Sequence, residues 1–233
     1  MRVISWDEFT AGNNSPNAGG TGARQSACGG LSPEFCSAKL HAGIEGPESQ
    51  REASPLMNEL PLALTVGVFD GLHLGHQKLV RRVCAQAGCE PAVVTFAQNP
   101  AAVMRPDVFP GDLFSLDEKL ALLRALGVSL VALIDFSRDF STIRGRDFLA
   151  ALLGGRKVAF VALGENFRCG RGAETDALAA RAFAGERGTE VWIAEPVMDG
   201  GLPISSSRIR RALAEGRTDE AERLLGRPYS ARG

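Results

Sequence analysis

Five short apolar segments recur along the chain after residue 60, and a polar or helix-like stretch follows each one. They span residues 62–69, 91–96, 130–136, 158–163 and 191–197. Each is shorter than a typical helix and rich in β-branched or aromatic residues, which is typical of strands buried on both faces of a sheet. Residues 2–6 predict one more short strand at the start of the chain.

The stretches between these strands carry apolar residues at helical spacing. After the first buried strand, apolar positions 79, 80, 83, 84 and 87 predict a helix, and further helices are predicted at 116–126, 146–153, 177–187, 207–215 and 219–225. Ser115 and Glu118 have the spacing of a capping box, and Ser206 and Thr218 are candidate N-caps. This alternation predicts an α/β fold with a doubly wound (Rossmann-like) parallel sheet of about five strands, covered on both faces.

Residues 11–59 show no sustained apolar period. They are rich in Gly, Ser, Asn, Pro and Ala, a composition that cannot bury enough apolar surface to offset the entropy of ordering. We predict a disordered, low-complexity insert there, with His41 simply solvated. The expected organisation is one domain made of residues 60–233 together with the first strand at 1–10.

Composition restricts the class of function. The 26 Lys and Arg nearly cancel the 27 Asp and Glu, so no overall field attracts nucleic acid or a lipid surface. No apolar run approaches the roughly 18 residues of a membrane span, and residues 1–10 lack the core of a signal peptide. Five cysteines without C-x-x-C spacing predict reduced, structural thiols. These features indicate a soluble cytoplasmic protein.

The turn after strand 62–69 carries the strongest chemical signal, two histidines in an H-x-G-H arrangement, His73 and His76. Gly71 and Gly75 allow backbone amides to approach a phosphate, and the start of the next helix favours negative charge at the same place. Both histidines can then donate hydrogen bonds to phosphoryl oxygens. The alternative is that they only cap the helix. A zinc site lacks further ligands, since the third histidine is His41.

Three other stretches are candidates by their position. The sequence ISSSRIR at 204–210 places serine hydroxyls and Arg208 and Arg210 at a helix start, which suits a polyphosphate. Taken alone, this stretch is better explained as an N-capped amphipathic helix with a solvated basic face. The loops at 164–176 and 95–100 both leave the carboxyl end of a predicted strand, where open parallel sheets bind ligands. Alone, each predicts only a connecting loop.

Taken in order, these stretches resemble the FAD synthetase (FMN adenylyltransferase) module of the bacterial bifunctional riboflavin kinase/FAD synthetase family, which belongs to the HxGH nucleotidyltransferases. The matching sequences are GVFDGLHLGHQKL (67–79), TFAQNPAAV (95–103), LFSLDEKLALLRALGV (113–128), DFSRDFSTIRGRDFL (135–149), GENFRCG (164–170) and PISSSRIRRAL through LLGRPY (203–229). The resemblance covers nearly everything after residue 60.

The resemblance implies transfer of AMP from ATP to FMN, giving FAD and pyrophosphate. It implies catalytic roles for His73, His76 and Arg210. The residues implied at the ATP site are Gly67, Phe69, Asp70, Gly75, Ser205, Ser206, Ser207 and Arg208, and those implied at the flavin are Asn99, Asn166, Phe167 and Arg168. Mg²⁺ is expected to arrive with ATP, held by phosphate oxygens and water, so no protein ligand is named.

Three departures from the family pattern stand out. Ala97, Gln98 and Asn99 replace the Asp, Pro and His of the usual Asp-Pro-His-Pro, Cys169 replaces a phenylalanine, and the insert at 11–59 is unusual. The sequence given also stops where the riboflavin kinase module begins, so no kinase activity is expected. Two rival hypotheses remain open: another HxGH nucleotidyltransferase, acting on pantetheine phosphate or a polyol phosphate, and a non-catalytic nucleotide- or flavin-binding protein.

Overall fold

A six-stranded parallel sheet forms the centre of the computed structural model, which describes residues 1–11 and 60–229. The strand order is β1 (Arg2–Ser5), β4 (Leu130–Ile134), β3 (Glu90–Phe96), β2 (Leu62–Val66), β5 (Val158–Gly164) and β8 (Glu190–Ala194). The predicted doubly wound parallel sheet is confirmed, with six strands instead of about five because β1 pairs with β4 at the edge. The predicted insert at 11–59 lies outside the described residues, except for Ala11.

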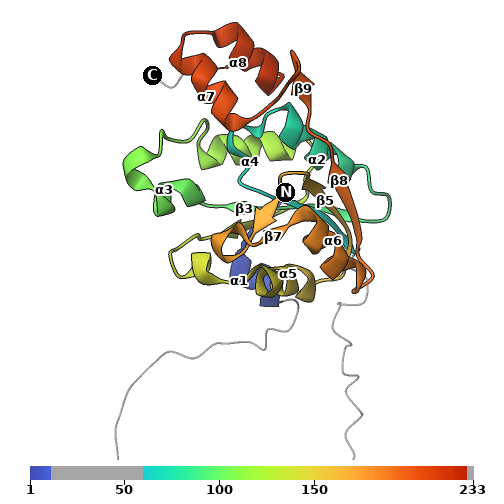
Figure 1. The fold of residues 1–233 in the computed structure, drawn as a ribbon. Helices are drawn as coiled ribbons and strands as arrows, with labels where there is room; N and C mark the ends of the chain where they lie inside the picture. The colour runs from blue at the N-terminus through green and yellow to red at the C-terminus, as the bar shows by residue number, and fades with distance from the viewer. Residues whose placement is uncertain (12–59, 230–233) are drawn as a thin grey trace, which may run out of the picture. The chain divides into compact units, whose positions relative to one another are not determined.

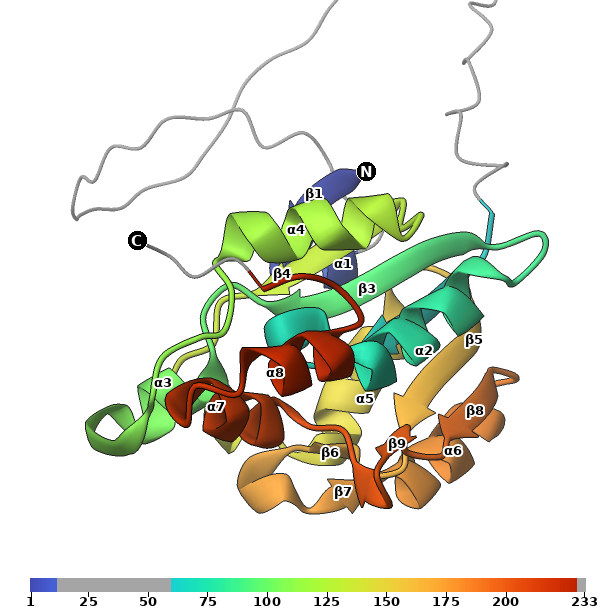
Figure 2. The ribbon, with the colours of Figure 1, turned by 90° about the horizontal axis from the view of Figure 1, so that it is seen from above.

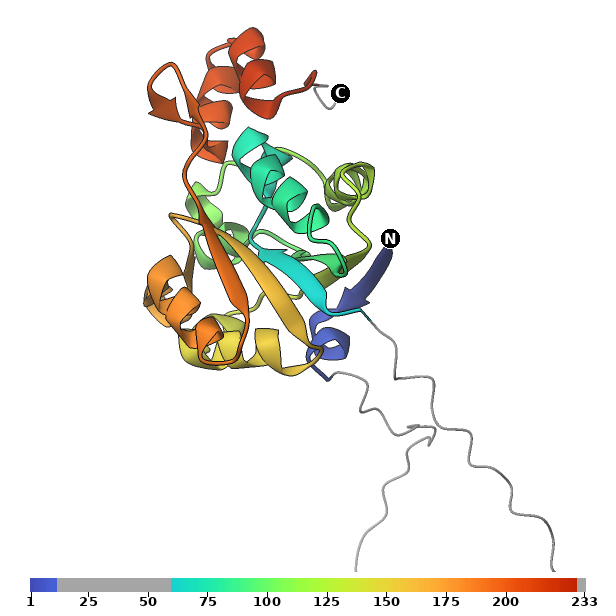
Figure 3. The same cartoon turned by 90° about the vertical axis from the view of Figure 1, so that its right-hand side faces the viewer.

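Helices cover both faces of this sheet, as Figures 1 and 3 show. On one face α1 (Trp6–Ala11), α5 (Gly145–Gly154) and α6 (Ala177–Gly185) pack against Leu62, Leu64 and other strand residues of the same parity. On the other face α2 (Leu74–Cys84) and α4 (Leu116–Ala125) pack against residues of opposite parity, such as Ala63. The two cores follow from the period-2 alternation of side chains along each strand.

A third, smaller core joins α7 (Ser206–Ala214) and α8 (Thr218–Leu225) to Leu113 and Ile204. Leu74, in the first turn of α2, packs against it, and Figure 2 shows α7 and α8 beside α2. The predicted caps of these helices were wrong. Ser205, one residue earlier than expected, caps α7, and α8 begins at Thr218 without a side-chain cap. The capping box of α4 is confirmed, with both reciprocal hydrogen bonds between Ser115 and Glu118.

Several short elements were not predicted from the apolar pattern, because each has five residues or fewer and cannot show a period. They are α3 (Pro100–Met104), the 3₁₀ turns η2 (Asp70–Leu72), η3 (Pro106–Val108), η4 (Phe140–Thr142) and η5 (Arg171–Ala173), and the hairpins formed by β6 (Arg168–Cys169) with β7 (Thr175–Asp176) and by β9 (Met198–Asp199) with β10 (Leu202–Pro203). Within the described part of the chain, no helix is both long and apolar enough to cross a membrane.

The order of the strands determines where a ligand can bind. From β2 the chain adds β3 and β4 on one side of the sheet and later β5 and β8 on the other, so the order reverses beside β2. In open parallel sheets, ligands bind at the carboxyl ends of the strands at such a reversal. The turn that leaves β2 carries His73 and His76, and it lies at this point.

Candidate functional site

The turn between β2 and α2 has an unusual backbone. Phe69, Gly71 and Leu72 all have positive φ angles, of 52°, 74° and 38°. Phe69 and Leu72 are strained in this region, and such strain persists only where surrounding contacts hold it. Two observations explain why position 71 is a glycine. Its φ angle of 74° lies where other residues are strained, and a Cβ atom there would come within 2.7 Å of the Leu113 side chain. The turn is therefore a fixed feature, held by its neighbours.

His73 and His76 form a stacked pair at the end of this turn. Their ring centroids are 3.6 Å apart with an interplanar angle of 17°. His73 is the N-cap of α2, and its Nδ1 accepts a hydrogen bond from the backbone N–H of His76 at 3.3 Å. The ring of His73 lies so close to Gly75 that a Cβ there would be 3.1 Å from two ring atoms. Gly75 thus leaves room for the stacked pair.

Both histidines are neutral at pH 7. Burial lowers the pKa of His73 to about 4, with a further contribution from the positive charge of Arg227. Burial likewise lowers the pKa of His76 well below its ordinary value, aided by His73 and by Lys119. Because Nδ1 of neutral His73 accepts a hydrogen bond, its proton must sit on Nε2. His73 can therefore donate from Nε2, and it has no free ring nitrogen to act as a base.

This neutral state predicts a loss of stability in acid. The unfolded chain binds a proton at His73 below the ordinary pKa of 6.5, whereas the folded chain resists protonation until about pH 4. The contribution of neutral His73 to the free energy of unfolding is therefore complete above pH 6.5 and is lost as the pH falls toward 4. At about 1.4 kcal/mol per pH unit, this reduces the free energy of unfolding by about 3 kcal/mol. Urea unfolding at pH 7, 6, 5 and 4 measures it.

The matched variant for this measurement is His73→Asn, which keeps an N-cap and cannot titrate. We expect it to lose less stability between pH 7 and pH 4 than the wild type does. Equal losses in the two proteins would contradict the assigned neutrality of His73, because acid-sensitive carboxylates elsewhere are common to both.

Asp70 and Arg210 join the turn to α7. The Nη2 atom of Arg210 forms a short ion pair with Asp70 Oδ2 and also donates to the carbonyl of Gly111 at 2.9 Å. Asp70 Oδ1 accepts the backbone N–H of Leu113 at 2.9 Å. Burial raises the pKa of Asp70, against the opposing effects of Leu113 and Arg210. The Ser206 hydroxyl donates to the Asp70 carbonyl at 2.8 Å, which docks the start of α7 on the turn.

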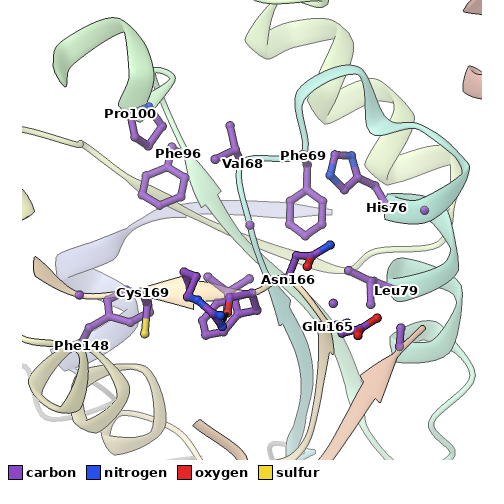
Figure 4. Close-up of a pocket in the computed structure, with 18 of the residues that line it drawn as sticks. Val68, Phe69, His76, Leu79, Phe96, Pro100, Phe148, Glu165, Asn166 and Cys169 are labelled. Carbon is purple, nitrogen blue, oxygen red and sulfur yellow. Dashed lines mark hydrogen bonds between the residues drawn. The ribbon is translucent and has the colours of Figure 1, made fainter. Parts of the chain in front are cut away.

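A cavity of about 600 Å³ opens on one side of the histidine pair. We call it the aromatic cavity, because its wall includes Phe69, Phe96, Phe136, Phe140, Phe148 and Phe167. Figure 4 shows Phe69 beside His76, with Phe96 from β3, Phe148 from α5, Asn166 from the loop after β5 and Cys169 from β6. Phe96 meets Phe136 edge to face at 5.7 Å between centroids. Its size and lining suit a planar aromatic ligand.

A second cavity, of about 630 Å³, also borders His76. We call it the cationic cavity, and its lining includes Asp70, Asn99, Ser206, Ser207, Arg210 and Arg211. Ser206 and Ser207 come from the first turn of α7, where backbone amides and the helix dipole favour an anion. Val68 and His76 line both cavities. A ligand that extends from one cavity to the other therefore passes His76.

The fold brings most of the predicted site residues to these two cavities. Asp70, Ser206, Ser207 and Arg210 line the cationic cavity, and His73, Asn166, Phe167 and Arg168 line the aromatic one. Gly67, Phe69 and Gly75, expected at ATP, also line the aromatic cavity. Asn99, expected at the flavin, lines the cationic cavity instead. There its side chain caps α3 through Ala101 and donates to Asp112 at 2.8 Å.

Two predicted ATP-site residues line neither cavity. The hydroxyl of Ser205 accepts the backbone N–H of Arg208 as the N-cap of α7. The guanidinium of Arg208 binds Asp199 Oδ2 at 2.6 Å and Glu220 Oε1 at 3.1 Å. Arg208 therefore joins α7 to α8 and the β9–β10 hairpin, and its placement does not support the predicted contact with ATP.

Sequence reasoning missed several residues of the site. Phe136, Phe140 and Phe148 of the aromatic wall lie within DFSRDFSTIRGRDFL, a stretch that supported the resemblance but was given no role. Their four- and eight-residue spacing after a strand was the available signal. Arg211, next to Arg210, lines the cationic cavity, and the sequence had given it no role. Cys169 lines the aromatic cavity, and burial, together with Glu174, raises the pKa of its thiol to about 12, so it stays protonated.

The described residues hold no group of three or more His, Cys, Asp or Glu side chains arranged to bind a metal ion. The carboxylates at the cavities are Asp70, already paired with Arg210, and Glu165 and Glu195 of the aromatic cavity, and the two imidazoles are neutral. This set does not form the oxygen-rich cage that a hard cation such as Mg²⁺ prefers.

Comparison with known proteins gives consistent matches. The model of the FAD synthetase family matches residues 57–208. The bifunctional riboflavin kinase/FMN adenylyltransferase of Escherichia coli K12 is 34% identical over 174 residues, covering 73% of this chain and 56% of that protein. The Listeria monocytogenes protein of the same name is 32% identical over 176 residues, covering 73% of this chain and 55% of that protein. The chain thus spans about half the length of these relatives.

Among solved structures, the chain resembles a Streptococcus pneumoniae protein described as a macrolide-efflux protein. The TM-score is 0.66 and the sequence identity 29%, and the match covers 74% of this chain and 58% of the other.

Proposed function

The chain belongs to the FAD synthetase family, and from this premise we propose that it transfers AMP from ATP to the phosphate of FMN, giving FAD and pyrophosphate. The observation that carries the proposal is the junction of the two cavities at Val68 and His76. An isoalloxazine ring suits the aromatic cavity, and a triphosphate suits the cationic one. The FMN phosphate and the α-phosphate of ATP then meet beside the histidine pair.

The reaction needs no nucleophile from the protein. An oxygen of the FMN phosphate forms a bond to the α-phosphorus of ATP while the bond from that phosphorus to the bridging oxygen breaks. Pyrophosphate leaves with the electron pair. The attacking phosphate is already ionised at pH 7, so no general base is required. The protein's contribution is then to orient the two phosphates and to stabilise the charge that moves between them.

Each group at the junction has a role that follows from its protonation and position. Nε2 of neutral His73 is a hydrogen-bond donor, and His76 lies where the two cavities meet. Arg210 holds the cationic cavity in place through Asp70 and Gly111, and its Nη1 makes no hydrogen bond to any described residue. That atom, with Ser207 and Arg211, supports binding of the departing pyrophosphate. We assign Mg²⁺ to the substrate complex Mg-ATP, held by phosphate oxygens and water.

The test is to incubate the purified protein with FMN and Mg-ATP and to separate the products by chromatography. FAD and pyrophosphate in equal amounts support the proposal. A parallel sample with riboflavin in place of FMN measures any kinase activity separately. A third sample with pantetheine phosphate tests the rival acceptor. Product in that sample and none with FMN would assign the site to another nucleotidyltransferase.

Absence of any adenylyl product, with FMN and ATP still bound by calorimetry, would favour the non-catalytic hypothesis. The first variants to make would then replace Ala97, Gln98 and Asn99 with the Asp, Pro and His of the usual family pattern. In the folded chain these positions are occupied by structural contacts: Gln98 donates to Asp135 and to the carbonyl of Phe136.

A further inference from the structure

Two half-buried cations hold the opposite ends of the strained turn that precedes His73. At the first end, Nζ of Lys119 in α4 donates to the carbonyl of Val68 at 3.1 Å and to that of Phe96 at 3.4 Å. The Thr95 hydroxyl also donates to Val68, at 3.2 Å. Lys119 thus joins the carboxyl ends of β2 and β3 at the residue that lines both cavities, although it lines neither cavity itself.

At the second end, Arg227 follows α8 and reaches back to the turn. Its Nη2 donates to the carbonyl of Gly71 at 2.6 Å, and its Nη1 donates to that of Leu72 at 3.0 Å. Gln77 Nε2 donates to the same Leu72 carbonyl at 3.0 Å. The guanidinium also lies over the ring of Phe114, 4.8 Å from its centroid. The two residues that immediately precede His73 are therefore fixed by a side chain about 150 positions away.

We propose that Lys119 and Arg227 are positioning residues that clamp the 68–72 turn and thereby set the orientation of the His73 and His76 rings. This inference rests on the proposed adenylyl transfer for its catalytic consequence. Positive φ angles at Phe69 and Leu72 are unfavourable, so the turn relaxes where its outer contacts are removed. The histidines follow directly after it, and a shift of about 1 Å in a catalytic group can cost about a hundredfold in rate.

The positive charge of each clamping residue also acts on one of the two histidines. Burial is the main cause of the lowered pKa values of both histidines; the positive charge of Arg227 lowers the pKa of His73 further, and His73 and Lys119 lower that of His76 further. Other charged groups act on the clamp. The carboxylates of Asp70 and Asp112 interact with Lys119, and that of Glu118 interacts with Arg227. Asp70 in turn is paired with Arg210. Loss of either cation is therefore expected to raise the pKa of its own histidine.

The first experiment measures FAD formation by Lys119→Met and Arg227→Met. We expect kcat to fall by about ten- to a hundredfold in each, with KM for Mg-ATP and FMN nearly unchanged, because neither residue lines a cavity. The charge-conserving variants Lys119→Arg and Arg227→Lys should recover part of the rate. Arg124→Met, on an exposed position of α4, and Arg223→Met, at an exposed ion pair of α8, are matched controls expected to leave kcat unchanged.

The second experiment does not depend on activity. Histidine side-chain NMR is tractable here because the sequence has three histidines, of which His41 can be assigned by substitution. We expect the pKa of His76 to rise in Lys119→Met and that of His73 to rise in Arg227→Met, each cation acting on its own ring. Folded variants with wild-type kcat and unchanged histidine titrations would overturn the clamp. A wild type that forms no FAD would contradict the proposed function, while the NMR pattern would still test the clamp.

Discussion

Replacing His73 with asparagine is expected to lower kcat for FAD formation by about a hundredfold or more. The imidazole Nε2–H is a preorganised donor toward the phosphates, and loss of one such donor typically costs 10²- to 10³-fold. Asparagine retains the other role of His73, since its side-chain oxygen can accept the His76 N–H as an N-cap. Steady-state kinetics with varied Mg-ATP and FMN measure the loss, which should fall on kcat more than on KM.

His73→Ala separates the two roles of this residue. It should lose as much activity as His73→Asn and, in addition, about 1 kcal/mol of stability, because α2 then lacks its cap. If His73→Asn retained wild-type kcat, the imidazole would be no more than a capping group, which is the alternative that the sequence left open.

Replacing Arg210 with methionine is expected to have a comparable effect on the use of ATP. We expect kcat/KM for Mg-ATP to fall by about 10²- to 10³-fold, because the cationic cavity loses the arginine that supports pyrophosphate departure. The variant should also lose about 2 kcal/mol of stability, since Asp70 keeps only its hydrogen bond from Leu113. Kinetics and urea unfolding measure the two effects separately.

The double variant Asp70→Asn with Arg210→Met distinguishes stability from catalysis. Asparagine removes the unpaired buried charge, so part of the stability should return while the activity stays low. Arg210→Lys keeps the positive charge, but an ammonium group cannot bind Asp70, Gly111 and a phosphate at once as the planar guanidinium can. We therefore expect this variant to recover little of the activity. Recovery of full activity in the double variant would show that Arg210 acts only by neutralising Asp70.

The strands and most helices were predicted correctly from the apolar pattern. The errors in their predicted ends and caps have specific causes. The predicted strand at 191–197 ends at Ala194, because Pro196 follows and cannot donate to a sheet. The N-cap of α7 was placed at Ser206 because three consecutive serines offer equivalent caps. Only the docked helix shows that Ser205 caps it while Ser206 binds the Asp70 carbonyl.

The sequence by itself determined which residues could reach the site. Alternation along the strands and helical spacing between them follow from local geometry, and together they place the H-x-G-H turn at the carboxyl end of a buried strand. Tertiary structure decided which side chains are available there. Arg208 and Arg210 are two positions apart on one helix, yet Arg208 is bound to Asp199 and Glu220 while Arg210 lines the cationic cavity. Partners from distant segments made that distinction, as they did for Lys119 and Arg227, because burial and hydrogen bonding depend on contacts that local patterns do not encode.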